Sequence, residues 1–257
     1  MDHVKAGQTA GILRCDVGVN VWGTLAEQAV VPAASVAPVP RGWSLEQMAA
    51  APLVFLTAWQ ALTQWTEPAA PPAKSSVLLI TGASGGVGHA CVLLGKSMGL
   101  TVVALSRSTE KAARLKELGA DFTFDPEDPQ LHANVLAAVA PRRIDLVVDN
   151  VAGPLFPVVV GMLGYGGRIS VVGRSAGPVP EFNTGTLFFK RARIGGVAVG
   201  DYTPASAREA WNAIVSRLDS IERRPVIDRV FPFARVREAF ARLAAAPLGK
   251  VLVRVAA

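Results

Sequence analysis

The stretch VLLITGASGGVGHA, residues 77–90, decides the fold of this chain, because an apolar run there ends in a glycine-rich turn. An apolar run without polar alternation is typical of a strand that a parallel sheet buries on both faces. In the turn, Gly85 lets the backbone approach a pyrophosphate, and Gly88 lets the following helix pack closely on the sheet. Backbone N–H groups at the start of that helix then face the phosphates. The stretch therefore predicts a dinucleotide-binding turn.

The turn departs from the usual G-x-G-x-x-G pattern in one place, because Ala83 stands at the first glycine position. A glycine turn alone is weak evidence, since such turns also join strands and helices that bind nothing. Here a strand precedes it, a helix over 90–98 follows, and a second strand over 101–106 completes a βαβ unit of about 30 residues. This context favours a nucleotide site over a purely structural turn. The residues expected to hold the phosphates are Ala83, Ser84, Gly85, Gly86, Val87 and Gly88.

The residues after the second predicted strand indicate which cofactor binds. An acidic residue about 20 positions past the turn would bind the ribose 2′-hydroxyl of NAD, and none is present. The chain instead has Ser106, Arg107 and, one helical turn further on, Lys111. A hydroxyl and two cations suit a 2′-phosphate, so NADP(H) is the expected cofactor. The alternative is that Arg107 and Lys111 only begin a solvated helix.

Strands and helices continue to alternate after this unit. Four more strands are expected over 122–124, 144–149, 168–172 and 193–197, and crossover helices over 109–118, 131–139 and 154–163. This alternation predicts an α/β fold with a doubly wound, parallel six-stranded sheet of the Rossmann type. Ligands of such sheets lie at the carboxyl ends of the strands, at the switch point between the first and fourth strands. The residues expected there are Asn150, Val151, Gly173, Arg174 and those at 198–202.

The two ends of the chain differ in character from this central part, and we expect them to share one small, mainly β lobe. The elements predicted there are short strands over 22–31, 35–39, 227–231 and 250–255, and helices over 45–65 and 236–245. The predicted organisation is a first segment over 1–44, a nucleotide-binding domain over 45–225 and a C-terminal segment over 226–257.

Composition limits the classes of protein to which the chain can belong. Of its 257 residues 51% are hydrophobic, yet charges and turn residues interrupt each apolar run before the roughly 18 residues that a membrane span needs. The N-terminus lacks the apolar segment of a secretory signal, and there are only two cysteines, so we expect a cytoplasmic protein without membrane contact. The net charge of +6 comes from basic residues scattered along the chain without a nucleic-acid motif. We therefore expect no nucleic-acid partner.

Candidate metal ligands are few in this sequence. The cysteines and histidines are Cys15, Cys91, His3, His89 and His132. No pair of them shows the C-x2-C or H-x3-H spacing of a zinc site. His89 and Cys91 lie two positions apart at a helix start and do not face each other. No metal site is therefore expected.

Several stretches occur in an order that resembles one family. They are GTLAEQAVVPAASVAPVP, AAAPLVFLTAWQAL, TGASGGVG, SRSTEKAARLKELGAD, GGRISVVG, TLFFKRARIGG and RPVIDRVFPF. From about Trp22 to its C-terminus the chain resembles the medium-chain dehydrogenase/reductase superfamily. The turn A-S-G-G-V-G and the lack of an acidic residue after the second strand are similar to its zinc-independent, NADPH-dependent quinone oxidoreductase branch, with the enoyl reductases close by. Members begin with a longer GroES-like catalytic lobe, most of which we expect to be missing here.

The resemblance also implies roles for individual residues. Those that it places around the nicotinamide are Thr57, Asn150, Val172, Gly173, Phe188 and Phe189. The threonine would lie near the ring, the next three would line its ribose and carboxamide, and the two phenylalanines would close over it; packing alone is the alternative role. Tyr202 follows the sixth strand and is a better-placed proton donor than Tyr165, which precedes the fifth. Thr57 and Tyr202 are thus weak candidates for catalytic residues, and an exposed loop position is the alternative for the tyrosine.

The function implied by the resemblance is an NADP(H)-dependent oxidoreductase that transfers hydride to a quinone or an α,β-unsaturated carbonyl compound without zinc. One alternative is an NADPH-binding module without turnover, because of the missing lobe. Another is a zinc-type alcohol dehydrogenase, which needs ligands that the sequence lacks. The resemblance further implies a homodimer in which the segment 193–199 pairs across a two-fold axis.

Overall fold

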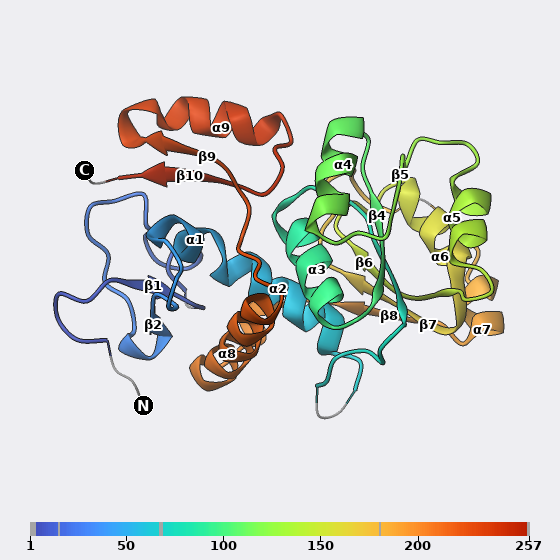
Figure 1. Cartoon of the computed structure of the whole chain (residues 1–257), viewed down its shortest axis with the longest axis horizontal. Coiled ribbons are helices and arrows are strands. Elements are labelled where there is room, and N and C mark those ends of the chain that lie inside the picture. Colours follow the sequence, from blue (N-terminus) through green and yellow to red (C-terminus); the bar gives the residue numbers. More distant parts are fainter. Residues whose placement is uncertain (1–3, 15, 67–68, 180, 256–257) are drawn as a thin grey trace. The chain divides into compact units, whose positions relative to one another are not determined.

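The computed structural model describes residues 4–14, 16–66, 69–179 and 181–255, which fall into two compact units (Figure 1). The terminal unit joins the two ends of the chain, residues 1–56 and 199–257, and the sheet unit is residues 57–198. Both ends therefore fold together. The sequence pattern instead predicted a central domain over 45–225. The bounds differ because helices at both borders of that domain pack with the terminal segments.

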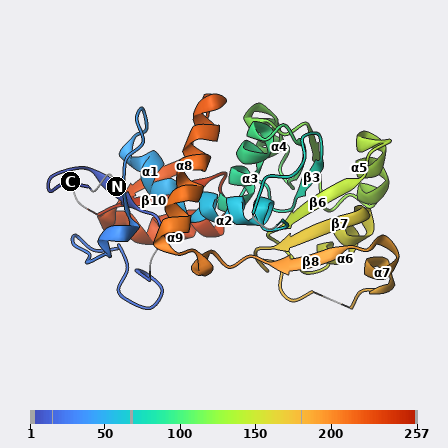
Figure 2. The same ribbon diagram turned by 90° about the horizontal axis from the view of Figure 1, so that it is seen from below.

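The sheet unit is built on a parallel six-stranded sheet with the order β5-β4-β3-β6-β7-β8 (Figures 1 and 2). Its strands are β3 (Val77–Ile80), β4 (Thr101–Leu105), β5 (Phe122–Phe124), β6 (Ile144–Asp149), β7 (Leu163–Val171) and β8 (Arg193–Gly196). The order reverses between β3 and β6, the first and fourth strands of the unit. The doubly wound fold and its switch point are thus confirmed.

Helices cover both faces of this sheet. They are α2 (Pro52–Thr63), α3 (Gly86–Ser97), α4 (Thr109–Leu118), α5 (Leu131–Val139), α6 (Leu155–Met162) and α7 (Gly185–Lys190). Right-handed crossovers place α3 and α4 on one face and α5 and α6 on the other. Leu79 packs in the core beneath α5 and α6, whereas Leu78 faces Gly95 of α3. The apolar run at 77–80 is therefore buried on both sides.

Ser170 anchors the carboxyl end of α2 to the sheet. It is fully buried in β7, accepts hydrogen bonds from Gln64 Nε2 at 3.0 Å and Trp65 Nε1 at 2.9 Å, and donates to Ala61 O at 2.6 Å. The Trp65 ring lies against Gly195 of β8, where a Cβ would be 3.0 Å from the ring. A small residue at each of these two strand positions lets the helix end lie close to the sheet.

The terminal unit combines short strands with helices. It contains β1 (Ala10–Ile12), β2 (Val36–Pro38), α1 (Leu45–Ala50), α8 (Pro204–Ser220), β9 (Ile227–Pro232), α9 (Val236–Ala244) and β10 (Lys250–Arg254), with short 3-10 turns at Ala33–Ser35, Val199–Asp201 and Phe233–Arg235. The first two strands pair antiparallel, and β9 pairs parallel with β10. The predicted C-terminal strands and the helix between them are confirmed.

Two predictions for the N-terminal segment are wrong. The predicted strand over 22–31 is absent from the described residues, and Trp22 and Val30 are each 96% exposed there, because no strand lies beside them to complete a ladder. The predicted helix over 45–65 is two helices. It breaks at Ala51, because Pro52 has no N–H to donate to Met48 O and proline is favoured at the first position of a new helix.

Helix α8 was missed, although the sequence carries evidence for it. Thr203 caps the helix by accepting from Ser206 N, and Pro204 follows at the first helical position. The buried face repeats at helical spacing: Ala207, Ala210, Trp211, Ile214 and Leu218. Small and aromatic residues in that series obscure the apolar pattern when only aliphatic side chains are counted.

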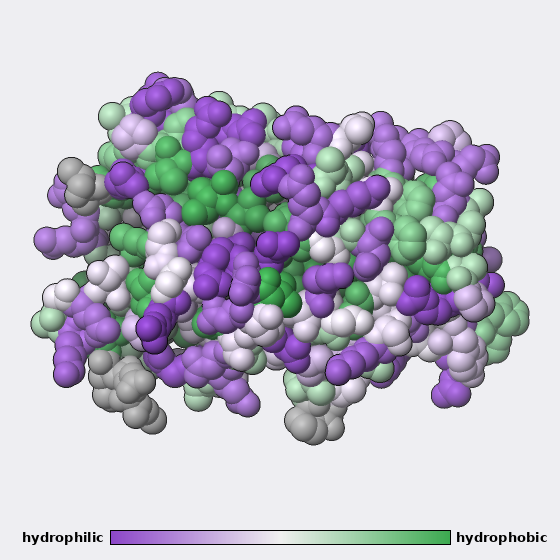
Figure 3. Space-filling model, in the orientation of Figure 1, coloured by the Kyte–Doolittle hydropathy of each residue, from purple (hydrophilic) through white to green (hydrophobic). Residues whose placement is uncertain are grey.

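The surface mixes polar and apolar side chains (Figure 3). Within the described residues, no helix combines the length and apolar character that a bilayer crossing demands. Strand β8 lies at the edge of the sheet and pairs with β7. The homodimer through residues 193–199 and the cytoplasmic location stay predictions.

Replacing Ser170 by alanine should lower the free energy of unfolding by about 1–3 kcal/mol, because three buried polar groups of α2 and the segment after it lose their partner. Urea denaturation followed by tryptophan fluorescence measures this change. Ser175→Ala is the matched control, since its hydroxyl is exposed and reaches only Asn150 O at 3.3 Å. Equal stability of the two variants would contradict the anchoring role.

Candidate functional site

The glycine-rich turn leaves the carboxyl end of β3 and enters α3 within a few residues. Gly82 has φ +58°, a left-handed conformation that favours glycine, and its carbonyl accepts from Gly85 N at 3.0 Å. Ala83 N donates to Leu105 O at 3.3 Å, which ties the turn to the end of β4. Gly85 is the extended N-cap of α3. Helix geometry leaves the first N–H groups after this cap without an i−4 partner, so they are available to an anion.

Gly88 shows why the third glycine of the pattern is needed. A Cβ at this position would lie 2.3 Å from Gly82 O and 2.6 Å from Ala83 Cα, both backbone atoms. Real Cβ contacts of this length do not occur, so only glycine allows α3 to begin so close to the strand end. Ala83 itself is fully buried, and a methyl group is tolerated at the first position of the pattern.

A buried carboxylate joins the turn to the next strand. Asp149, the last residue of β6, is fully buried, and its Oδ1 accepts from Thr81 Oγ1 at 2.6 Å and from Val151 N and Ala152 N at 3.1 Å each. Thr81 Oγ1 in turn accepts from Asn150 N at 2.9 Å. These bonds, with the backbone bond from Thr81 N to Val148 O at 3.1 Å, hold the ends of β3 and β6 together at the switch point.

Asn150, Val172 and Gly173, three of the residues predicted around the nicotinamide, lie together at this switch point. Asn150 Nδ2 donates to Thr81 O at 2.8 Å. Val172 N and Gly173 N both donate to Asp149 O, at 2.8 and 3.2 Å. A Cβ on Gly173 would be 2.9 Å from Asn150 O, so glycine is required for this approach. The structure thus brings the three residues next to the glycine turn.

The residues predicted to select the cofactor follow β4 directly. Ser106 continues the strand end, and its N–H donates to Phe124 O at 3.0 Å. Ser108 caps α4 by accepting from Lys111 N at 3.3 Å, and this bond fixes the backbone position of Lys111 in the first turn of the helix. The Arg107 side chain is 70% exposed, and its guanidinium lies 3.8 Å from a carboxylate oxygen of the equally exposed Glu127. Hydroxyl and cationic groups therefore gather beside the turn, with one loosely paired carboxylate opposite.

Two further predicted site residues, Phe188 and Phe189, lie away from this cluster, whereas the roles of Thr57 and Tyr202 stay predictions. Thr57 is buried on α2, one turn before Ala61. Phe188 and Phe189 are more than three quarters exposed on α7, which ends just before β8 begins and so lies at the amino edge of the sheet, opposite the turn (Figure 2). The structure therefore does not place the phenylalanines over a nicotinamide at the turn. The resemblance rests on the order of residues along the chain, and this order does not reveal the direction in which β8 runs.

Tyr202, the predicted proton donor, belongs to the terminal unit. Its phenol is partly buried after the turn Val199–Asp201, and this burial raises the pKa of Tyr202 to about 12. Tyr165 is exposed near the amino end of β7; it was predicted to precede this strand, but the strand begins earlier, at Leu163. Tyr202 is therefore protonated at neutral pH.

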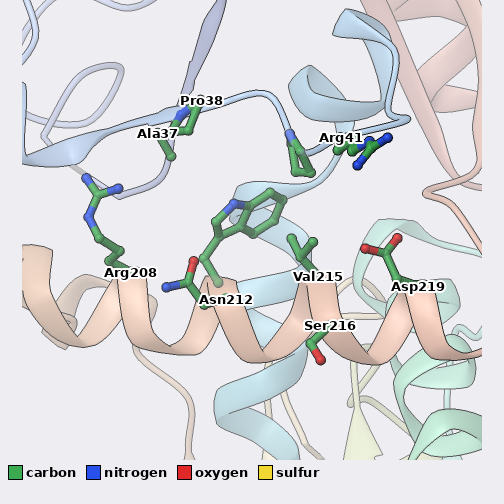
Figure 4. Close-up of a pocket in the computed structure, with 10 residues that line it drawn as sticks. Ala37, Pro38, Arg41, Arg208, Asn212, Val215, Ser216 and Asp219 are labelled. Atoms are coloured by element: carbon green, nitrogen blue, oxygen red, sulfur yellow. The ribbon is translucent and has the colours of Figure 1, made fainter. Parts of the chain in front are cut away.

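A pocket of about 790 Å³ opens within the terminal unit, between α8 and the segment after β2 (Figure 4). Asn212, Ser216 and Asp219 line it from the helix, and Arg208 lies at one end. The guanidinium of Arg208 donates to Ala34 O and Val36 O, and Asp219 pairs with Arg224 at 2.9 Å. Two of its charged groups are thus already satisfied within the fold. The pocket contains none of the predicted cofactor residues.

The candidate metal ligands do not gather. Among the described residues no cluster of three or more histidine, cysteine or acidic side chains has metal-binding geometry; Cys15 and His3 lie outside these residues. His89 and Cys91 are both fully buried on α3, and His89 Nδ1 lies 3.1 Å from Gly85 O. Burial raises the pKa of the Cys91 thiol well above its usual range, which disfavours the thiolate that a metal would need.

Substituting Gly88 by alanine should weaken NADPH binding at least about tenfold and destabilise the protein, because the new methyl group meets backbone on both sides of the turn. Titration followed by nicotinamide fluorescence measures the binding. Gly196→Ala is the matched control, because no described atom lies within 4 Å of a Cβ built at that position. Unchanged binding by the Gly88 variant would show that the turn does not hold the cofactor.

Removing the carboxylate of Asp149 should lower the free energy of unfolding by about 2–4 kcal/mol, since the Thr81 hydroxyl and two backbone N–H groups lose their acceptor. Asp149→Ala tests this by urea denaturation. Asp149→Asn keeps an acceptor oxygen at Oδ1 and should recover most of the loss. A loss as large in the asparagine variant would mean that the negative charge, and not the hydrogen bonds, holds the switch point.

Comparison with known proteins gives this site its context. Residues 86–219 match the family model described as "Zinc-binding dehydrogenase". A zinc-type alcohol dehydrogenase-like protein of Schizosaccharomyces pombe is 27% identical over 91% of this chain and 66% of its own length, and a putative quinone oxidoreductase of Bacillus subtilis is 29% identical over 83% and 64%. The chain thus spans slightly less than two thirds of these curated relatives.

Solved structures agree with the sequence comparison. The quinone oxidoreductase of Thermus thermophilus, whose structure was also determined in complex with NADPH, is 31% identical, with a TM-score of 0.80 over 98% of this chain and 78% of that one. The fold, the turn and these similarities lead to one assignment. The chain belongs to the zinc-binding dehydrogenase family of the medium-chain dehydrogenase/reductase superfamily.

Proposed function

We propose that this chain is an NADP(H)-dependent oxidoreductase that transfers hydride to a quinone or an α,β-unsaturated carbonyl compound without a metal. The observation that supports NADP(H) over NAD(H) is the set of side chains after β4, which are hydroxyls and cations. They follow the strand beside the glycine turn, where Gly88 leaves no space for a side chain. A carboxylate at this place would repel a 2′-phosphate. Relatives named as quinone oxidoreductases support the substrate class.

The residues present fit an NADP(H) molecule at the switch point. The turn at 83–88 would hold the pyrophosphate through backbone N–H groups and the start of α3. Ser106, Arg107 and Lys111 would hold the 2′-phosphate. Asn150, Val172 and Gly173 would line the nicotinamide half, and the close approach of Gly173 to Asn150 O fixes their backbone there.

When bound, the cofactor supplies the hydride. The chain's own part is to orient the two reactants, exclude water and provide a proton or hydrogen bond to the substrate oxygen. Thr57 and Tyr202 are the proposed donors. Burial raises the pKa of the Tyr202 phenol, so this side chain would donate a hydrogen bond to the substrate oxygen and not release its proton.

A second candidate function is a nucleotide-binding module without turnover. The observation that favours it is that the chain spans 64–66% of the length of the two curated relatives, so a substrate site built from their whole length is represented here only in part. Loss of nicotinamide absorbance in the presence of 1,4-benzoquinone or a simple enone separates the two functions. Binding without turnover would favour the module.

We expect NADPH to bind at least about tenfold more tightly than NADH, and Arg107→Ala to reduce that preference to near unity by removing a charge-assisted hydrogen bond. Ser106→Glu should reverse the preference, because its carboxylate would accept from a ribose 2′-hydroxyl and repel a phosphate. Nicotinamide fluorescence titrations with both cofactors measure these affinities. Arg114→Ala is the control, since that exposed arginine of α4 pairs with Glu117. Equal binding of the two cofactors by the unmodified chain would overturn the cofactor choice.

A further inference from the structure

Two arginines stand side by side at the start of the last strand pair of the sheet. Arg168 of β7 and Arg193 of β8 are register partners, so their side chains leave the same face of the sheet from Cα atoms about 4.8 Å apart. The guanidinium of Arg193 lies over the Trp65 ring, 5.7 Å from its centroid. Trp65 is itself held by Ser170. Two like charges are thus fixed next to each other against a rigid aromatic wall.

The protein provides little to neutralise this pair. Arg168 Nε is buried and has no hydrogen-bond partner, and within the described ranges neither arginine forms an ion pair. Asp145 is the acidic residue that attracts Arg168, but its Oδ2 is engaged by Val77 N at 2.7 Å. Burial and the neighbouring Arg193 lower the pKa of Arg168. A guanidinium nevertheless stays charged in proteins, so the unpaired donor and the repulsion remain.

Neighbouring cations add to the positive potential at this edge. Lys190 donates to Gly161 O at 2.6 Å, and Arg143 donates to Arg142 O at 3.2 Å, so in the described part of the chain both bond to carbonyl groups and not to a carboxylate. Burial and, after it, the charge of Arg143 lower the pKa of Lys190. A positive field of this kind raises the local concentration of anions.

We propose that Arg168 and Arg193 bind a small divalent oxyanion of the phosphate or sulfate class. Such an ion accepts from both planar guanidinium forks at once and cancels the repulsion between the two arginines. The site is distinct from the proposed cofactor site. The arginines stand three register positions before the carboxyl ends at Val171 and Gly196, about 10 Å along the strands, and near the opposite edge of the sheet.

Thermal unfolding of the intact chain tests the site. Sodium phosphate should raise the Tm in a saturable way, beyond sodium chloride at the same ionic strength. Arg193→Gln and Arg168→Gln should each weaken the apparent phosphate affinity about tenfold or more. Arg168→Lys keeps the charge but loses the planar fork, so its apparent phosphate affinity should lie between those of the unmodified chain and Arg168→Gln.

Two control variants distinguish this site from phosphate bound elsewhere on the protein. Arg191→Gln removes an exposed cation of the same edge, whose Nη1 lies 3.4 Å from the Tyr165 hydroxyl, and should leave the phosphate effect unchanged. Arg107→Ala should also leave the phosphate effect unchanged. If phosphate instead bound at the 2′-phosphate position, this variant would abolish the effect. Arg193 is exposed, so its variant remains informative even where Arg168→Gln fails to fold. A phosphate effect no larger than that of chloride, or one that survives Arg193→Gln, would overturn the proposal.

Discussion

The hydrogen bond from the Thr81 hydroxyl to the buried carboxylate of Asp149 holds the switch point on which the site depends. At this point the order of the strands reverses: β4 and β5 follow β3 toward one edge of the sheet, and β7 and β8 follow β6 toward the other. The paired residues of β3 and β6 end at Ile80 and Val148. The Oδ1 atom of this carboxylate accepts three hydrogen bonds, two of them from backbone N–H groups, whereas Oδ2 is buried without a partner among the described residues. Together with the bond from Asn150 Nδ2 to Thr81 O, the carboxylate joins the strand end before the glycine turn to the loop after β6.

Close backbone approach is the second constraint. Gly88 lies against Gly82 O and Ala83, and Gly173 lies against Asn150 O, so backbone and not side chains fills the space around the proposed cofactor position. Backbone N–H groups bind phosphates without selecting between the two nicotinamide cofactors. Selection therefore falls to the few side chains after β4, where charge can act at short range.

The two ends of the sheet differ in their electrostatics. The carboxyl edge combines a glycine turn, hydroxyls and Arg107 with Glu127 nearby. Near the amino edge of β6 to β8 lie Arg168 and Arg193 as register partners, and Asp145 attracts Arg168. The anion sites proposed at the two edges rest on different groups: helix N–H groups and an exposed arginine at one edge, and two neighbouring guanidinium groups, one of them over an indole, at the other.

The amino-acid sequence alone was sufficient to predict the parallel sheet and its switch point, the place of the glycine turn and the groups that follow β4, because these depend on apolar runs and spacings within about 30 residues. It also carried enough motif information to identify the superfamily. Other features emerged only from the folded chain. Asp149 supports the turn, Phe188 and Phe189 lie at the opposite edge, residues 22–31 form no strand in the described structure, and Arg168 and Arg193 are neighbours. Each of these depends on contacts between residues distant in the chain, or on their absence, and spacing along the sequence does not encode which strand or helix will lie alongside.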